Sequence, residues 1–116
     1  MRLADDFYTL IDSKRTERGW DAEVELNPAH GIYGGHFPGP PVVPGVCTLT
    51  IIRELLADFS GRGIRFSAIR ECKFVGAIVP EPGLRLHFSM ELEDNRLKCT
   101  ASRKGETALK LIATID

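Results

Sequence analysis

Apolar and polar residues alternate along four stretches of the chain, which is the period of a half-buried β-strand. The clearest stretch is residues 84–92, where every second residue is apolar and the residues between them are polar. Similar alternation occurs in residues 20–26, 96–103 and 108–115. Asp94-Asn95 and Lys104-Gly105 separate the last three stretches and suit tight hairpin turns. The pattern therefore predicts antiparallel strands joined by short connections.

Two further stretches are less regular. Residues 64–79 read as one long strand with a bend at Gly76, followed by a turn at residues 80–83. Residues 4–11 fit a short helix or a strand, and the pattern does not decide between them.

Only one segment has strong helical periodicity. Within residues 46–59, apolar residues recur at 46, 49, 52, 56 and 59, and Ile51 and Leu55 widen this stripe. Pro44 suits the first helical turn, and Ser60-Gly61 suits the end of the helix. The opposite stripe is polar and consists of Cys47, Thr50, Glu54 and Asp58.

These elements predict an α+β fold in a single domain, residues 1–116. One helix has apolar flanks and a curved antiparallel sheet has one face to cover, so the sheet is expected to wrap around the helix. Such a fold leaves sheet edges and apolar surface available, and we expect pairing with a second copy.

Composition narrows the classes of function. The formal net charge is −1 and lysines and arginines are scattered, which argues against nucleic acid or an anionic membrane as a partner. The sequence has no membrane-span-length apolar run and no signal-peptide core near residue 1, so a cytoplasmic protein is expected. Three cysteines without CxxC spacing indicate reduced thiols rather than a disulfide or a metal site.

The chemistry-bearing motif is GHFPGPPVVPGV, residues 35–46. Its prolines fix φ and its glycines allow close approach, so a stiff loop delivers His36 to the start of the helix. The N–H groups of Gly45, Val46 and Cys47 are expected to be free in the first turn, at the positive end of the helix dipole. An imidazole beside free N–H donors suits the polarisation of a carbonyl.

This motif resembles the signature of the hot-dog-fold 3-hydroxyacyl-[acyl carrier protein] dehydratases, and the similarity extends over roughly residues 20–115. The resemblance implies a hot-dog fold and a lyase that converts 3-hydroxyacyl thioesters on an acyl carrier protein to trans-2-enoyl thioesters, without metal or cofactor. It implies that His36 is the catalytic base and that the Gly45 N–H binds the thioester carbonyl. Phe37 and Val46 would line the cleft, and a homodimer or higher oligomer would contain the active sites.

The chain departs from the family pattern fourteen residues after His36, where the family has an acidic residue and this chain has Thr50. A threonine hydroxyl hydrogen-bonds but is no carboxylic acid. Glu54 follows one helical turn later, so its carboxylate could approach the same space, and Glu54 with Thr50 would receive the leaving hydroxyl. The alternative is a solvated Glu54. This region is also similar to divergent dehydratases of aryl polyene synthesis.

Two other functions stay open at this point. A non-catalytic acyl-binding or partner subunit of a dehydratase complex would explain Thr50, and a thioesterase could use Glu54 to activate water. His30 is interpreted as a structural imidazole at the cleft mouth, and His87 as solvent-exposed on a polar strand face.

Overall fold

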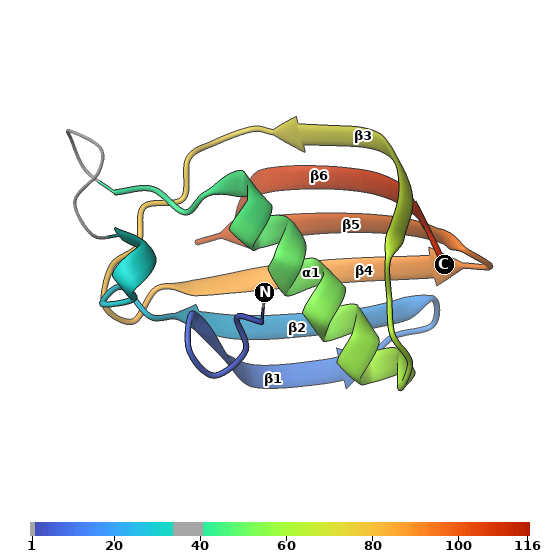
Figure 1. The fold of residues 1–116 in the computed structure, drawn as a ribbon, viewed down its shortest axis with the longest axis horizontal. Helices are drawn as coiled ribbons and strands as arrows, with labels where there is room; N and C mark the ends of the chain where they lie inside the picture. The colour runs from blue at the N-terminus through green and yellow to red at the C-terminus, as the bar shows by residue number, and fades with distance from the viewer. Residues whose placement is uncertain (1, 34–40) are drawn as a thin grey trace.

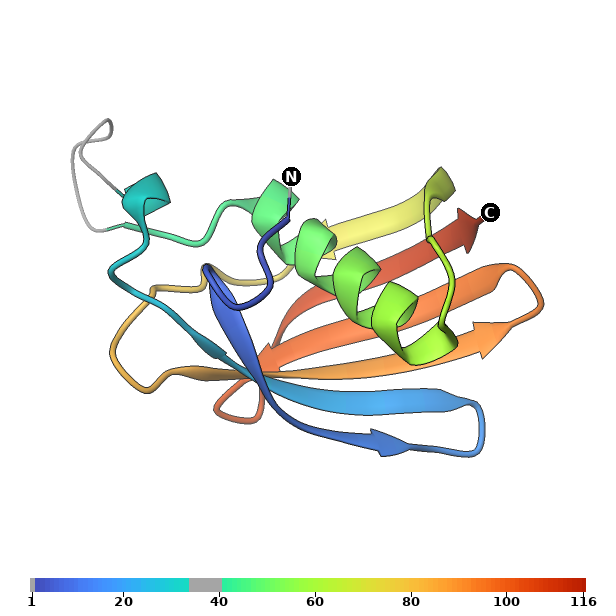
Figure 2. The same cartoon turned by 60° about the horizontal axis from the view of Figure 1, so that its bottom comes forward.

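The computed structural model describes residues 2–33 and 41–116 as one six-stranded antiparallel sheet with a single α-helix across one face (Figure 1). The strand order is β1-β2-β4-β5-β6-β3, so β1 and β3 form the two edges. Figure 2 shows the sheet curving beneath the helix. The elements are β1 (Tyr8–Arg15), β2 (Gly19–Leu26), the 3-10 helix η1 (Gly31–Tyr33), α1 (Gly45–Ser60), β3 (Phe66–Phe74), β4 (Arg85–Glu93), β5 (Arg96–Arg103) and β6 (Glu106–Ile115).

The alternating stretches all form strands, and their apolar residues face the helix. Met90, Cys99 and Leu111 lie side by side across β4, β5 and β6, and all three are buried. At the β5–β6 hairpin, Lys104 (φ 49°) and Gly105 (φ 80°) both take the left-handed conformation that a tight hairpin turn requires. The predicted hairpins are therefore confirmed.

The two irregular stretches differ from expectation in informative ways. The segment that was undecided between helix and strand becomes β1 from Tyr8 onward. The long strand predicted over residues 64–79 is wrong beyond Phe74, where β3 ends. The N–H of Val75 still donates to the Ala108 carbonyl at 2.8 Å, but the chain then leaves the sheet edge and returns through a proline-containing connection.

Helix α1 ends as predicted at Gly61, which is left-handed (φ 73°) and donates its N–H to the Ala57 carbonyl. The predicted polar and apolar stripes are partly wrong, because Cys47 and Glu54 are buried whereas Val46 is 62% exposed. The sheet covers one flank of the helix and residues 3–8 contact the flank that carries Glu54, so more of its circumference is covered than the periodicity indicated. No helix among the described residues has the length and hydropathy needed to cross a membrane.

Candidate active site

The chain segments that flank the histidine motif lie at one end of the sheet. Figures 1 and 2 both show η1 and the approach to α1 at this end, away from the β1–β2 hairpin. His36 and Phe37 lie outside the described residues, so the predictions for both side chains stay predictions. The structure describes residues 27–33 before the motif, residues 41–46 in its second half, and the rest of α1 after it.

Gly45 is the first residue of α1, after Pro44 in the N-cap position. The N–H of Cys47 donates to the Pro44 carbonyl at 2.9 Å, so the prediction of a free Cys47 N–H is wrong. This bond is the tight i→i+3 type that helix starts commonly form. Within the described residues, the N–H groups of Gly45 and Val46 have no backbone acceptor. The helix start therefore keeps two donors for a ligand or for loop residues.

The ring of Phe74, at the end of β3, lies directly against Gly45. A Cβ atom built on Gly45 would lie 2.6 Å from Cζ of Phe74, which is closer than carbon atoms approach without a shift. A side chain at this position would displace the Phe74 ring, so packing favours glycine at the helix start, as does the chemistry that the motif suggests. The Phe74 side chain is itself 56% exposed, so it forms part of the surface beside the first turn.

Val46 and Thr50 occupy successive turns on the same side of α1. The Thr50 hydroxyl donates to the Val46 carbonyl at 2.8 Å. This bond orients the Thr50 oxygen and leaves its lone pairs able to accept a hydrogen bond. Thr50 thus places an oriented hydrogen-bond acceptor one turn beyond the free N–H groups. Its hydroxyl does not provide the carboxylic acid that the family has at this position.

Glu54 is 3% exposed and its carboxylate accepts three hydrogen bonds from its own chain. Leu3 N–H donates to Oε2 at 2.7 Å, Ala4 N–H donates to Oε1 at 2.9 Å, and the Tyr8 hydroxyl donates to Oε1 at 3.0 Å. The interpretation of Glu54 as a solvated carboxylate is therefore wrong. The carboxylate still has one lone-pair site unused, but Glu54 is buried and presents almost no surface to a leaving hydroxyl.

An apolar surface hollow of about 280 Å³ lies beside the helix start. The end of β3, the chain after it and the residues just before α1 form its walls, with Thr48 of α1 at one side. Its lining residues are Val42, Val43, Thr48, Phe74, Val75, Gly76, Ala77, Ile78, Ala108 and Leu109. An open apolar hollow next to free N–H donors matches a ligand that has a polar head and an apolar tail.

Tyr33 and Cys47 lie near each other beside the first turn of α1, a contact that the sequence did not predict. Burial raises the pKa of Tyr33 to about 12, and the neighbouring Cys47 adds to this shift. The Tyr33 hydroxyl is buried and has no hydrogen-bond partner among the described residues. Burial also raises the pKa of the Cys47 thiol, which makes Cys47 a poor nucleophile. The only sequence signal for Tyr33 is its place three residues before His36.

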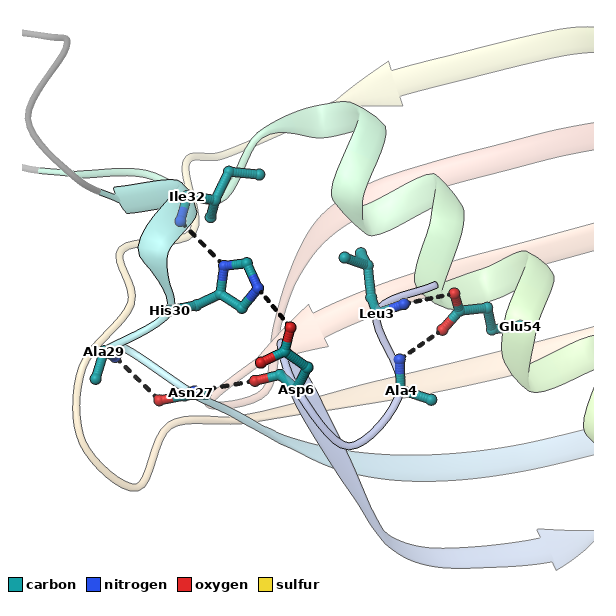
Figure 3. A network of polar contacts seen from close by, with 8 residues as sticks. All are labelled: Leu3, Ala4, Asp6, Asn27, Ala29, His30, Ile32 and Glu54. Carbon is teal, nitrogen blue, oxygen red and sulfur yellow. Dashed lines mark hydrogen bonds and ion pairs between the residues drawn. The ribbon is translucent and has the colours of Figure 1, made fainter. Parts of the chain in front are cut away.

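The two described histidines fit their interpretations. His30 Nδ1 accepts from the Ile32 N–H at 3.0 Å, so the ring proton lies on Nε2, which faces Asp6 Oδ2 at 3.1 Å (Figure 3). His30 is therefore a structural imidazole. His87 is half exposed on β4, 3.9 Å from Asp21. No group of three metal-ligating side chains occurs among the described residues.

Comparison with known proteins gives consistent matches. The family described as ApeI-like, ApeI dehydratase, matches residues 12–111. Among solved structures, the dehydratase heterocomplex ApeI:P from Xenorhabdus doucetiae matches with a TM-score of 0.79 at 21% identity, over 92% of this chain and 96% of that chain. An uncharacterized protein from Erwinia carotovora matches with a TM-score of 0.71 at 25% identity, over 93% and 92% of the two chains.

Several curated relatives carry the name 3-hydroxyacyl-[acyl-carrier-protein] dehydratase FabZ. The protein from Lactobacillus helveticus is 30% identical, over 90% of this chain and 86% of its own length. The protein from Ligilactobacillus salivarius is also 30% identical, over 73% of this chain. The chain spans only 59% of the length of this second relative.

Proposed function

Because this chain belongs to the ApeI-like dehydratase family, we propose that it removes water from 3-hydroxyacyl thioesters on an acyl carrier protein and forms trans-2-enoyl thioesters. The observation that carries the proposal is the start of α1. There, at the last two residues of the GHFPGPPVVPGV motif, the N–H groups of Gly45 and Val46 have no backbone acceptor among the described residues. Hydrogen-bond donors placed where negative charge develops are a main source of rate enhancement in thioester chemistry.

In the proposed reaction, His36 removes a proton from the carbon beside the thioester carbonyl. The Gly45 N–H donates to the carbonyl oxygen and stabilises the enolate-like transition state, aided by the positive end of the helix dipole. The bond from the β-carbon to its hydroxyl then breaks, and the hydroxyl takes up the proton that His36 removed from the neighbouring carbon and leaves as water. No metal or redox cofactor takes part in these steps.

Thr50 is the proposed contact for the leaving hydroxyl. Its oxygen is oriented by the bond to the Val46 carbonyl and has free lone pairs, so it can accept from the β-hydroxyl and fix its direction. The matching proposal for Glu54 has less support, because its carboxylate is buried and accepts three bonds from residues 3–8. The site therefore has one proposed base, one proposed carbonyl donor and one proposed hydroxyl contact.

Acyl binding is proposed for the apolar hollow beside the helix start. Its volume of about 280 Å³ accommodates a short acyl segment, and Phe74, which lines it, also lies against Gly45. Val46, next to Gly45 in the first turn of α1, is exposed. Phe37 is proposed to complete the cleft lining together with Val46. The acyl carrier protein would present the thioester from outside, since the hollow is open to the surface.

The protein is further proposed to act as a homodimer or a larger assembly. β3 is a sheet edge. Ile69 and Phe74 are exposed on it, Val75 is exposed directly after it, and Val79 is exposed in the connection that follows. Unpaired strand edges with apolar side chains are commonly covered by another chain. A non-catalytic partner subunit is the second candidate function, and it draws support from Thr50 at the position of the family's acid.

The test is incubation of the purified protein with 3-hydroxyacyl carrier-protein thioesters of several chain lengths, followed by intact mass spectrometry for loss of one water. The wild type is expected to reach the equilibrium mixture of hydroxyacyl and enoyl forms, and His36→Ala is expected to lose this activity while it keeps its fold. His87→Ala is the matched control, since His87 lies on the outer face of β4. An inactive wild type, or full activity in His36→Ala, would contradict the proposal.

A further inference from the structure

Glu54 fixes the segment before β1 against the middle of the central helix. Figure 3 shows the carboxylate facing the backbone of Leu3 and Ala4, whose consecutive N–H groups donate to its two oxygens. The Tyr8 hydroxyl adds a third donor, and Leu3 and Tyr8 are each 2% exposed. A buried carboxylate requires such donors, because an unpaired charge in the interior is strongly unfavourable. Residues 3–8, here called the N-terminal brace, are thereby held in one position.

The other side of the N-terminal brace contacts the segment that leads into the histidine motif. Asn27 Nδ2 donates to the Asp6 carbonyl, and the Asn27 N–H donates to the Phe7 carbonyl, both at 2.9 Å. His30 Nε2 lies 3.1 Å from Asp6 Oδ2, while His30 Nδ1 accepts from the Ile32 N–H (Figure 3).

Packing of aromatic rings adds to the contact between the N-terminal brace and the segment before the motif. Phe7 is fully buried and meets His30 edge to face, with ring centroids 5.3 Å apart. Its other neighbour is Tyr33, at 5.6 Å. The N-terminal brace therefore contacts both ends of residues 30–33, and Tyr33 is the last described residue before the motif.

We propose that Glu54 is a positioning residue that acts through the N-terminal brace and His30, and that it does not itself touch the substrate. This inference rests on the proposed dehydration. The contacts form one path from helix α1, which supplies the carbonyl donor, to the chain segment from which the base His36 follows three residues after Tyr33. The N-terminal brace thus links the helix that carries Gly45 to the segment that precedes His36 in the chain.

If Glu54 acts through these contacts, substitutions at Asp6, in the N-terminal brace, should lower kcat as substitutions at Glu54 do. Asp6→Ala removes the acceptor for His30, and because the Asp6 side chain is 72% exposed, kcat is expected to fall about 2- to 5-fold, the effect of losing one surface contact. Asp6→Asn keeps a carbonyl oxygen that can accept from His30 Nε2, so it is expected to retain most of the activity. KM is expected to change little, because the acyl hollow lies outside the path.

Glu54→Gln leaves one donor of the N-terminal brace without an acceptor and is expected to lower kcat to a similar extent. The double variant of Asp6→Ala and Glu54→Gln is expected to lose no more than the worse single variant, because both interrupt one path. Tyr8→Phe is a milder variant that keeps both backbone donors to Glu54. Thr16→Ala is the matched control, since it removes a 3.1 Å backbone-to-side-chain bond in the β1–β2 hairpin at the other end of the sheet.

Amide hydrogen exchange tests the N-terminal brace independently of activity. Glu54→Gln and Asp6→Ala are expected to speed exchange of the Ile32 N–H, which His30 Nδ1 accepts, and Thr16→Ala is not. A loss of kcat in Glu54→Gln with full activity in Asp6→Ala would overturn the proposal and restore Glu54 as a direct participant. Faster exchange with unchanged kcat would also overturn it. An inactive wild type with the exchange effect intact would show that the dehydration itself is the failing premise.

Discussion

The two tyrosines of this chain, Tyr8 and Tyr33, carry phenols that burial makes weak acids. Burial is the largest cause of the raised pKa of Tyr8, and the hydrogen bond to Glu54 raises it further, because a neighbouring carboxylate disfavours a phenolate. Burial likewise raises the pKa of Tyr33 to about 12. Both hydroxyls therefore stay protonated in the folded protein well above the ordinary pKa of 10.0.

Alkaline titration followed by absorbance at the phenolate band is expected to show no more than about a tenth of either tyrosine ionised in the folded protein at about pH 11. The unfolded chain releases both phenolic protons near pH 10, while the folded chain retains them. The free energy of unfolding is therefore expected to fall as pH rises above about 10, and Tyr8→Phe should reduce the slope. A tyrosine that titrates near pH 10 before the protein unfolds would contradict the buried positions.

The role of a residue could be predicted where neighbouring residues in the sequence determine it. It could not be predicted where the residue contacts a segment far away in the sequence. The Gly61 helix end and the left-handed Lys104-Gly105 turn follow from local chain geometry, and both were predicted. The environment of Glu54 was missed because its partners are backbone N–H groups 50 and 51 residues away, and an N–H carries no sequence signature. Helical periodicity placed Glu54 on the polar face, and a tertiary contact then buried it.

At the scale of elements, the start of α1 and the end of β3 are fitted to each other through Gly45 and Phe74. Gly45→Ala is expected to lower the free energy of unfolding by about 1–2 kcal/mol, since its Cβ would lie 2.6 Å from the Phe74 ring. In a Phe74→Ala background the same substitution is expected to be neutral or stabilising, because alanine favours helix. Denaturant unfolding of the four proteins measures the coupling.

Gly63→Ala serves as the control for this double-mutant cycle, because no atom lies within 4 Å of a Cβ added there. An equal cost of Gly45→Ala in both backgrounds would show that Phe74 does not pack on the helix start. Activity is expected to decline with Gly45→Ala even where stability is restored, since the added methyl group lies beside the carbonyl-binding N–H.

The strands in the middle of the sheet were predictable because each has one buried face, so a period of two appears in its sequence. β4, β5 and β6 follow this rule, and their predicted and observed positions agree closely. The predicted range of β3 was too long, because β3 is an edge strand with a largely exposed surface. Its sequence therefore has no burial pattern that marks where the strand ends. If another chain pairs with this edge, the exposure of its side chains would change more than that of the other strands.

At the scale of the whole molecule, the sheet has two unlike edges. β3 and the chain that follows it expose Ile69, Phe74 and Val75, and Val46 at the helix start is exposed as well. The β1 edge exposes only Leu10 and Ile11 as large hydrophobic residues of that strand. Burial of exposed apolar side chains stabilises an interface by roughly 25 cal/mol per Å². The β3 edge is therefore the better candidate for pairing.

The proposed homodimer is expected to form through the β3 edge. Light scattering coupled to size exclusion should give twice the chain mass for the wild type, and Ile69→Lys should shift the protein toward one chain mass, because the unpaired charge would be buried in the interface. Leu10→Lys places the same charge on the opposite edge and should leave the dimer intact. Dissociation by Leu10→Lys alone would locate the interface at β1.

The same variant tests whether the reaction centre needs both chains. If it does, Ile69→Lys should lose dehydratase activity in proportion to the fraction of protein that is monomeric. Activity that survives in a fully monomeric variant would mean that one chain is sufficient.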